Sequence, residues 1–100
     1  MLIKQISVFV ENVPGQLSEV SKILGENNID MSALSLADTT EFGILRLIVN
    51  DPEKACAVLR AQDFVVKQNY VVAVVVDDRP GGLTGVLDIL AAANVGVDYM

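Results

Sequence analysis

The sequence predicts an α+β fold in which helices cover one face of an antiparallel sheet. One observation is the order of segments: strand-like and helix-like periodicities follow one another as strand, helix, strand, strand, helix, strand. The other is an internal repeat, because residues 6–34 align without a gap on residues 72–100, at an offset of 66, and nine of the 29 aligned positions are identical. A repeat of this length is too long for a solenoid and suits one small domain per copy.

The first strand and helix follow from the spacing of apolar residues. Residues 3–10 predict a strand, because apolar side chains fall at every second position from Ile6 to Val10. Residues 15–27 predict a helix, since their apolar residues recur at spacings of three and four. The residues at 27–28, both Asn, end this helix, because Asn tolerates the left-handed conformation that stops helices.

The next four segments complete one unit. Strands are predicted over 29–36 and 42–49, with a turn at 38–41 between them. The run 51–53, Asp-Pro-Glu, predicts the start of the second helix, with an N-cap acceptor, a first-turn Pro and an acid at the positive end of the helix dipole. Residues 64–67 predict the fourth strand. Crossover connections place both helices on one face, so the expected fold is a ferredoxin-like βαββαβ sandwich.

The second copy is expected to be partial. Residues 70–76 predict its first strand, and the helix and part of the next strand follow by alignment with the first copy. We therefore expect one complete domain over residues 1–69. Residues 70–100 are expected to form the strand-helix-strand start of a second domain that stops about one third of a unit short.

Composition narrows the function. Seven basic and thirteen acidic residues give a net charge of −6, which repels phosphate backbones and anionic lipids, so no nucleic-acid or membrane partner is expected. The longest apolar run, 71–76, is too short to span a bilayer, and we expect a cytoplasmic protein. With no His and a single Cys, the chain has neither an intrachain disulfide nor a Ser-His or Cys-His nucleophile, and no metal or cofactor is expected.

The turn between the first strand and the first helix carries the motif of interest. Residues 11–17 read ENVPGQL and residues 77–83 read DDRPGGL. Pro presets the backbone for the first helical turn, and Gly allows a ligand or another backbone to come close. The helix beyond presents unpaired N–H groups and a partial positive charge, which suit a carboxylate. The alternative is that the Pro-Gly pair only makes a tight helix entry.

The order of elements, the ENVPGQL turn and the following NNIDMSALSL segment resemble an ACT domain, a small regulatory module that binds amino acids. The resemblance covers residues 1–69 fully and residues 70–100 as the first half of another copy. It implies that two units pair side by side and join their sheets. It also implies that an amino acid sits between the turn of one unit and the second strand of its neighbour. The start of the chain also resembles acetolactate synthase small subunits, but the second half does not follow their C-terminal pattern.

The resemblance also implies particular binding residues. Asn12 matches the turn position that holds the ligand in serine-sensing phosphoglycerate dehydrogenases, and Asp30 falls where that family has an Asn. The equivalents in the second copy are Asp78 and Gly96. Because Gly96 has no side chain and Val10 stands where the serine sensors carry a His, serine is not implied as the ligand. The expected ligand-binding residues are Asn12, Val13, Pro14, Gly15, Gln16, Leu17, Asp30, Met31, Asp78, Arg79, Pro80, Gly81, Gly82, Leu83, Gly96 and Val97.

The expected function is a regulatory sensor of a free amino acid that forms a dimer or larger homo-oligomer and is not an enzyme. Two alternatives stay open: a non-liganded oligomerisation module, and the regulatory subunit of an amino-acid biosynthetic enzyme, which would then be its partner. Catalysis of the acylphosphatase type is disfavoured, because no Arg lies in or beside the first turn and nothing near Arg79 could orient a water.

Overall fold

The structure is a computed structural model that describes residues 1–38 and 42–100. The elements, in chain order, are β1 (Leu2–Glu11), α1 (Gln16–Glu26), β2 (Met31–Asp38), β3 (Phe42–Val49), α2 (Pro52–Ala61), β4 (Val65–Val72) and α3 (Gly82–Ala92). Apart from residue 38, which ends β2, the turn expected at 38–41 lies outside the described residues.

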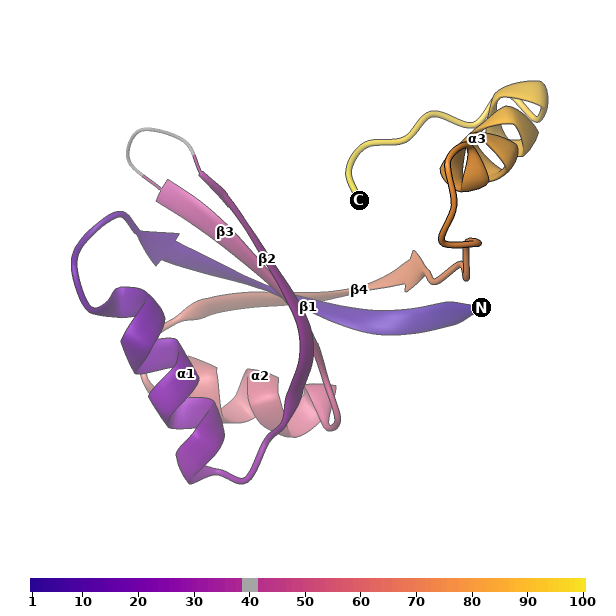
Figure 1. Ribbon diagram of the computed structural model, residues 1–100. Helices are drawn as coiled ribbons and strands as arrows, with labels where there is room; N and C mark the ends of the chain where they lie inside the picture. The colour runs from indigo at the N-terminus through magenta and orange to yellow at the C-terminus, as the bar shows by residue number, and fades with distance from the viewer. Residues whose placement is uncertain (39–41) are drawn as a thin grey trace.

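Four strands form one sheet in the order β2-β3-β1-β4, and every neighbouring pair is antiparallel. Helices α1 and α2 lie on one face of this sheet, while the C-terminal segment passes on the other side (Figure 1). The predicted ferredoxin-like α+β fold is confirmed. The sheet face opposite α1 and α2 is the open face.

The core lies between the two helices and the sheet face that they cover. Alternate residues of β1 and β3 meet the apolar stripes of α1 and α2 there, as their periodicities predict. The largest fully buried side chains are those of Ile6, Val8, Val20, Leu24, Leu45, Leu47, Cys56 and Leu59. Each buried aliphatic side chain stabilises the fold by about 1.5–3 kcal/mol relative to an exposed one. Leu17 shares the helical spacing, yet it is 47% exposed and stays outside this core.

The predicted helix boundaries are confirmed by cap geometry. The side chain of Asp51 accepts a hydrogen bond of 3.1 Å from the backbone N–H of Lys54, and Pro52 is the first residue of α2. Asn28 has a φ of 59°, the left-handed conformation expected after α1. The residue after Asn28 still takes part in the C-terminal cap of α1, because the N–H of Ile29 donates to the carbonyl of Leu24 at 2.9 Å. For this reason β2 begins at residue 31, two residues later than expected.

The prediction of separate strands over 64–67 and 70–76 is wrong. One strand, β4, pairs with β1 along its whole length, from Phe9 opposite Val65 to Leu2 opposite Val72. The polar residues in the middle of β4 suggested a break in the sequence, but their backbone groups take part in the ladder like any others. The expected boundary between residues 69 and 70 falls inside this strand. The division into domains at that point stays a prediction.

The second copy repeats the backbone of the first copy but not its packing. Helices α1 and α3 each have 11 residues, and the matched positions Gly15 and Gly81 both begin them in the left-handed conformation, with φ of 91° and 83°. Asn28 and Asn94 end them with φ of 59° and 58°. Within the part of the chain that the structure describes, however, α3 packs against no other helix or strand.

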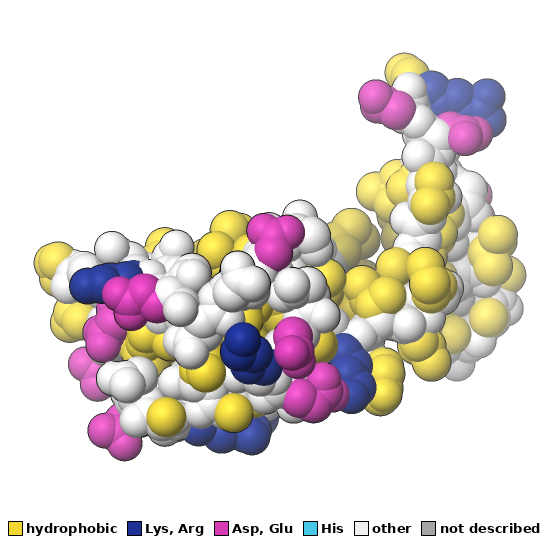
Figure 2. All heavy atoms as spheres, turned by 90° about the horizontal axis from the view of Figure 1, so that it is seen from below, with side chains coloured by type: hydrophobic (Ala, Val, Ile, Leu, Met, Phe, Trp, Pro, Cys, Tyr) yellow, Lys and Arg dark blue, Asp and Glu magenta, His cyan; other side chains and the backbone are white. Residues whose placement is uncertain are grey.

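Apolar side chains of the second copy are consequently exposed. Figure 2 shows them gathered on the part of the molecule that projects from the sheet and from α1 and α2. Ile89 of α3 is 71% exposed, whereas the matched residue of α1, Ile23, is buried. The strand expected to follow α3 is also wrong, since residues 95–100 form no ladder. A strand needs a partner for its backbone groups, and none of the described residues supplies one here.

Candidate ligand-binding site

The first turn places the start of α1 beside the end of β1. Gly15 is the N-cap residue, and its left-handed backbone is one that L side chains rarely adopt. The side-chain oxygen of Gln16 accepts a hydrogen bond of 2.8 Å from the backbone N–H of Glu11, which ties the two ends of the turn together. No side chain of the described residues caps α1. The N–H groups of Gln16 and Glu19 donate to the carbonyls of Val13 and Gly15, which leaves the N–H groups of residues 17 and 18 open in the first turn.

A hollow of about 390 Å³ lies next to this turn. The residues that line it are Val10, Glu11, Asn12, Val13, Leu17, Leu36 and Gly43. Three of the predicted binding residues are thus brought together, namely Asn12, Val13 and Leu17. Sequence reasoning missed Leu36 and Gly43, although strand register offers the signal: Val10 lies opposite Gly43. A Cβ atom at position 43 would lie 3.2 Å from the side chains of Val10 and Leu36. Glycine at this position therefore allows both side chains to pack closely against the strand.

Two predicted residues lie at the other end of the sheet. Met31 is paired with Val49, and the backbone of Asp30 is held by Asn50 through two hydrogen bonds, one of 3.0 Å to the side chain and one of 3.1 Å from the backbone. Within one unit, therefore, Asp30 and Met31 are not brought to Asn12. The expected contact between the turn of one unit and the second strand of its neighbour stays a prediction.

The second turn is tighter than the first. The N–H of Gly82 donates to the carbonyl of Arg79 at 3.0 Å, whereas the matched bond from Gln16 to Val13 is 3.5 Å long. The carbonyl oxygen of Asp77 lies 2.2 Å from where a Cβ at position 82 would stand, so only Gly fits there. Arg79 is paired with Asp77 at 3.4 Å and is exposed. Like α1, α3 has no side-chain cap among the described residues.

Three of the predicted residues of the second copy border an apolar hollow of about 470 Å³. Leu83, Gly96 and Val97 lie there, with valines of the segment 71–76 and the inner face of α3. The hollow is not lined by Asp78, Arg79, Pro80, Gly81 or Gly82. It is not lined by Asn12 either, whose turn lies at the opposite end of the molecule (Figure 1).

Comparison with known protein families also indicates two related units in this chain. The sequence profile of a family described as an ACT domain pair matches residues 1–100. The chain belongs to this family. Among solved structures, a protein from Bacteroides thetaiotaomicron is 43% identical, with a TM-score of 0.94 over 99% of this chain and 69% of that one. A search of curated proteins gave no match.

More distant structures share the fold of this ACT domain pair. The regulatory subunit of aspartate kinase from Thermus thermophilus is 13% identical, with a TM-score of 0.69 over 99% of this chain and 78% of that one. The ACT domain of a prephenate dehydrogenase from Bacillus anthracis is 24% identical, with a TM-score of 0.57 over 63% of this chain and 99% of that one.

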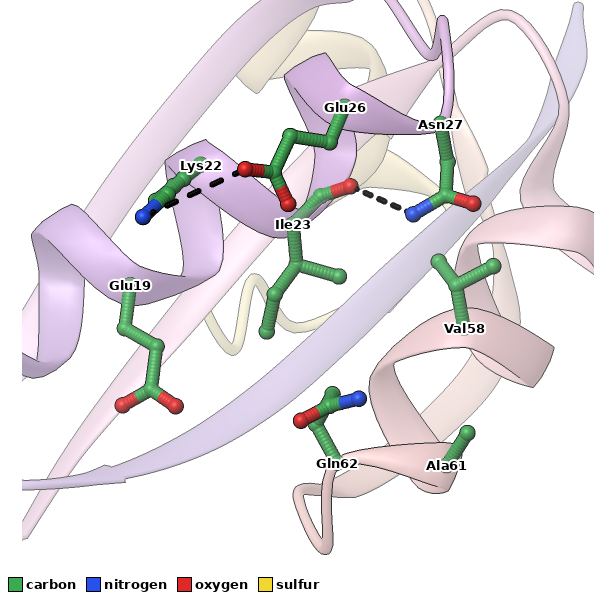
Figure 3. Close-up of a pocket in the computed structure, with 8 residues that line it drawn as sticks. All are labelled: Glu19, Lys22, Ile23, Glu26, Asn27, Val58, Ala61 and Gln62. Atoms are coloured by element: carbon green, nitrogen blue, oxygen red, sulfur yellow. Dashed lines mark hydrogen bonds and ion pairs between the residues drawn. The ribbon is translucent and has the colours of Figure 1, made fainter.

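Another hollow of the ACT domain pair lies between α1 and α2, with a volume of about 380 Å³ (Figure 3). Three of its polar side chains already have partners: Lys22 pairs with Glu26 at 4.0 Å, and the Asn27 amide donates to the carbonyl of Ile23 at 2.8 Å. None of the predicted binding residues lies there.

Tyr99 fixes the C-terminal segment to the open face. Its hydroxyl oxygen accepts hydrogen bonds from Gln5 at 3.0 Å and from Asn69 at 3.2 Å, and the Arg46 guanidinium lies 3.7 Å above the centre of its ring. The bonds from Asn69 and Gln5, with the charge of Arg46, favour the phenolate and lower the pKa of Tyr99. Gln5 is 7% exposed, so Tyr99 also gives a buried amide a partner. Sequence reasoning did not foresee this cluster, because its members are far apart in the chain.

We expect Tyr99→Phe to remove an early phase from the phenolate absorbance titration. The pKa of Tyr99 in the folded protein lies below the ordinary tyrosine pKa of about 10. Ionisation of Tyr99 therefore stabilises the docked segment fully at a pH above about 10, and this contribution is lost as the pH falls through the lowered pKa. Tyr70→Phe is the matched control and should keep the early phase. A difference titration of Tyr99 centred at the ordinary pKa would contradict the cluster.

Residues 1–38 and 42–100 contain neither a membrane-crossing helix nor a metal-ligating cluster. None of their helices has the length and apolar character needed to cross a bilayer. Their His, Cys, Asp and Glu side chains form no group of three that could hold a metal ion.

Proposed function

We propose that this ACT domain pair is a regulatory sensor that binds a free amino acid at the N-terminus of α1. The observation that carries the proposal is a contrast between helices. Helix α2 is capped by the side chain of Asp51, whereas α1 and α3, which follow the two repeated turns, have no side-chain cap in the described part of the chain. The donors left open at α1 suit the carboxylate of a ligand.

The surroundings of α1 also suit the other groups of an amino acid. Asn12 lines the hollow and can orient the carboxylate, while Glu11 offers a carboxylate for the ammonium group. Val13, Leu17 and Leu36 are between 47% and 49% exposed and provide an apolar wall for an aliphatic side chain. A neighbouring unit would cover this half-open hollow, so we propose that the sensor acts as a dimer or larger homo-oligomer, with a metabolic enzyme as a further partner.

A thermal-shift screen of the twenty amino acids tests the proposal. A ligand specific to the native state, present at 100 times its Kd, stabilises the fold by about 2.7 kcal/mol, which gives a clear rise in Tm. The matched control is the amine that lacks the α-carboxylate of each hit, and it should give no shift. If the amine stabilised the protein as well as the amino acid, the carboxylate seat at α1 would be wrong.

The non-liganded oligomerisation module is the second candidate. It is favoured by the exposed apolar face of α3 and by the apolar hollow of about 470 Å³ beside it. A screen in which none of the twenty amino acids shifts the Tm would support this candidate over the sensor.

A further inference from the structure

The open face of the sheet carries a row of polar side chains that no expected function uses. Strand register places Ser35 opposite Arg46, Arg46 opposite Ser7, and Ser7 opposite Lys67, so the row crosses all four strands. Directly opposite residues in a sheet have Cβ atoms about 4.5–5.5 Å apart, close enough for neighbouring side chains to act on one ligand. Two cations and two hydroxyls therefore share this face.

Arg46 has no acidic partner among the described residues. The ion pairs of that part of the chain join Lys4 to Glu53, Lys22 to Glu26 and Arg79 to Asp77. Arg60, which also lacks a carboxylate among the described residues, donates instead to the carbonyl of Val66 at 2.8 Å. The Tyr99 ring covers one face of its guanidinium at 3.7 Å. Stacking uses the face of the guanidinium and leaves N–H groups on its edge for a planar, two-oxygen acceptor.

A hollow of about 120 Å³ lies at this arginine. It is lined by Gln5, Ala33, Leu34, Ser35, Arg46 and Ile48. One part of the lining is polar and donates hydrogen bonds, and the other part is aliphatic. The volume is roughly that of four water molecules in the liquid, which suits a small ligand. A charged donor, a hydroxyl and a short aliphatic wall together match a carboxylate with a short hydrocarbon tail.

We propose that the open face binds a short aliphatic monocarboxylate, with its oxygens on Arg46 and Ser35 and its tail against Ala33 and Ile48, which lie opposite each other in the sheet. This site is separate from the first turn: it lies on the sheet face away from α1 and shares no lining residue with the hollow at Asn12. Its occupancy does not depend on amino-acid binding at α1.

Titration of the full chain with sodium propionate, followed through backbone amide resonances, tests the site. Saturable shifts are expected at Ser35, Arg46 and Ile48, and Arg46→Gln should weaken binding about tenfold or more, since it removes the charge-assisted hydrogen bonds. Lys67→Gln is the matched control: it removes a cation from the same row but outside the hollow, and it should change the affinity less than twofold. Propionamide, the neutral analogue, should give no saturable shift, and sodium chloride at equal concentration corrects for ionic strength.

Several results would overturn the proposal. Shifts confined to residues 12–17 would mean that propionate uses the turn at α1 instead, which would leave the sensor proposal standing. Equal losses from Arg46→Gln and Lys67→Gln would indicate a general response to charge. If Arg46→Gln did not fold, Ser35→Ala and Arg46→Lys would replace it, and unchanged affinity in both would contradict the site. Absence of saturable shifts at Ser35, Arg46 and Ile48 on addition of propionate would also contradict it.

Discussion

Leu24→Ala should lower the free energy of unfolding by about 3 kcal/mol, within the range of 2–5 kcal/mol seen for buried leucines. Leu24 of α1 is fully buried, and its removal leaves a cavity between the helix and the sheet. The matched residue 66 positions later, Leu90 of α3, is only partly buried. Leu90→Ala should therefore cost less than about 1 kcal/mol at low protein concentration. Urea denaturation of the two variants and the wild type measures both values.

Protein concentration is the control for this comparison. If the exposed face of α3 is covered when chains associate, the cost of Leu90→Ala will grow with concentration, because the side chain is then buried in the assembled form. Light scattering on the same samples would report the dimer or larger oligomer. A cost for Leu90→Ala equal to that for Leu24→Ala at every concentration would contradict the exposed placement of α3.

Sequence patterns predicted the elements whose signals are local. Alternation from Ile6 to Val10 and helical spacing around Leu24 each report burial against the same core, so periodicity and tertiary packing agree. The cap of α2 at Asp51 and the left-handed Asn28 were equally predictable, because their hydrogen bonds and backbone preferences are satisfied within a few residues.

The errors lie where the outcome depends on a distant partner. The polar middle of β4 suggested two strands, yet β1 pairs with it continuously because backbone groups, and not side chains, form the ladder. Residues 95–100 have the sequence of a strand but no partner strand among the described residues. The binding of Tyr99 by Gln5 and Asn69 brings together residues separated by 94 and 30 positions, which no local pattern records.

The candidate site was predicted in part for the same reason. The turn residues Asn12 and Val13 were recognised because the motif that contains them is contiguous and repeated. Leu36 and Gly43 complete the same hollow from two other strands, and strand register alone places them there. Asp30 and Met31 were assigned by resemblance to a contact between units, which one unit cannot display.

The two turns should differ in affinity for an amino acid, and Asn12→Ala should weaken binding more than Asp78→Ala. If units pair side by side, one site combines Asn12 with Gly96 and the other combines Asp78 with Asp30. Two carboxylates near one ligand favour its ammonium end but oppose its carboxylate end. The structure adds a second reason, because Asn12 lines the hollow beside its turn, whereas Asp78 does not line the hollow beside α3.

Calorimetry with the amino acid found by the thermal-shift screen would measure this difference. Loss of a hydrogen bond to a charged ligand group costs about 1.5–3 kcal/mol, which corresponds to tenfold or more in Kd. Asn12→Ala should show a loss of this size, and Asp78→Ala should change the Kd of the tighter site by less than threefold. Asn12 and Asp78 are both exposed turn residues at matched positions, so effects of the substitutions on folding should be small and similar. A larger loss from Asp78→Ala would assign the tighter site to the second turn. Equal and small losses of affinity in both variants would mean that the amino acid binds at neither turn.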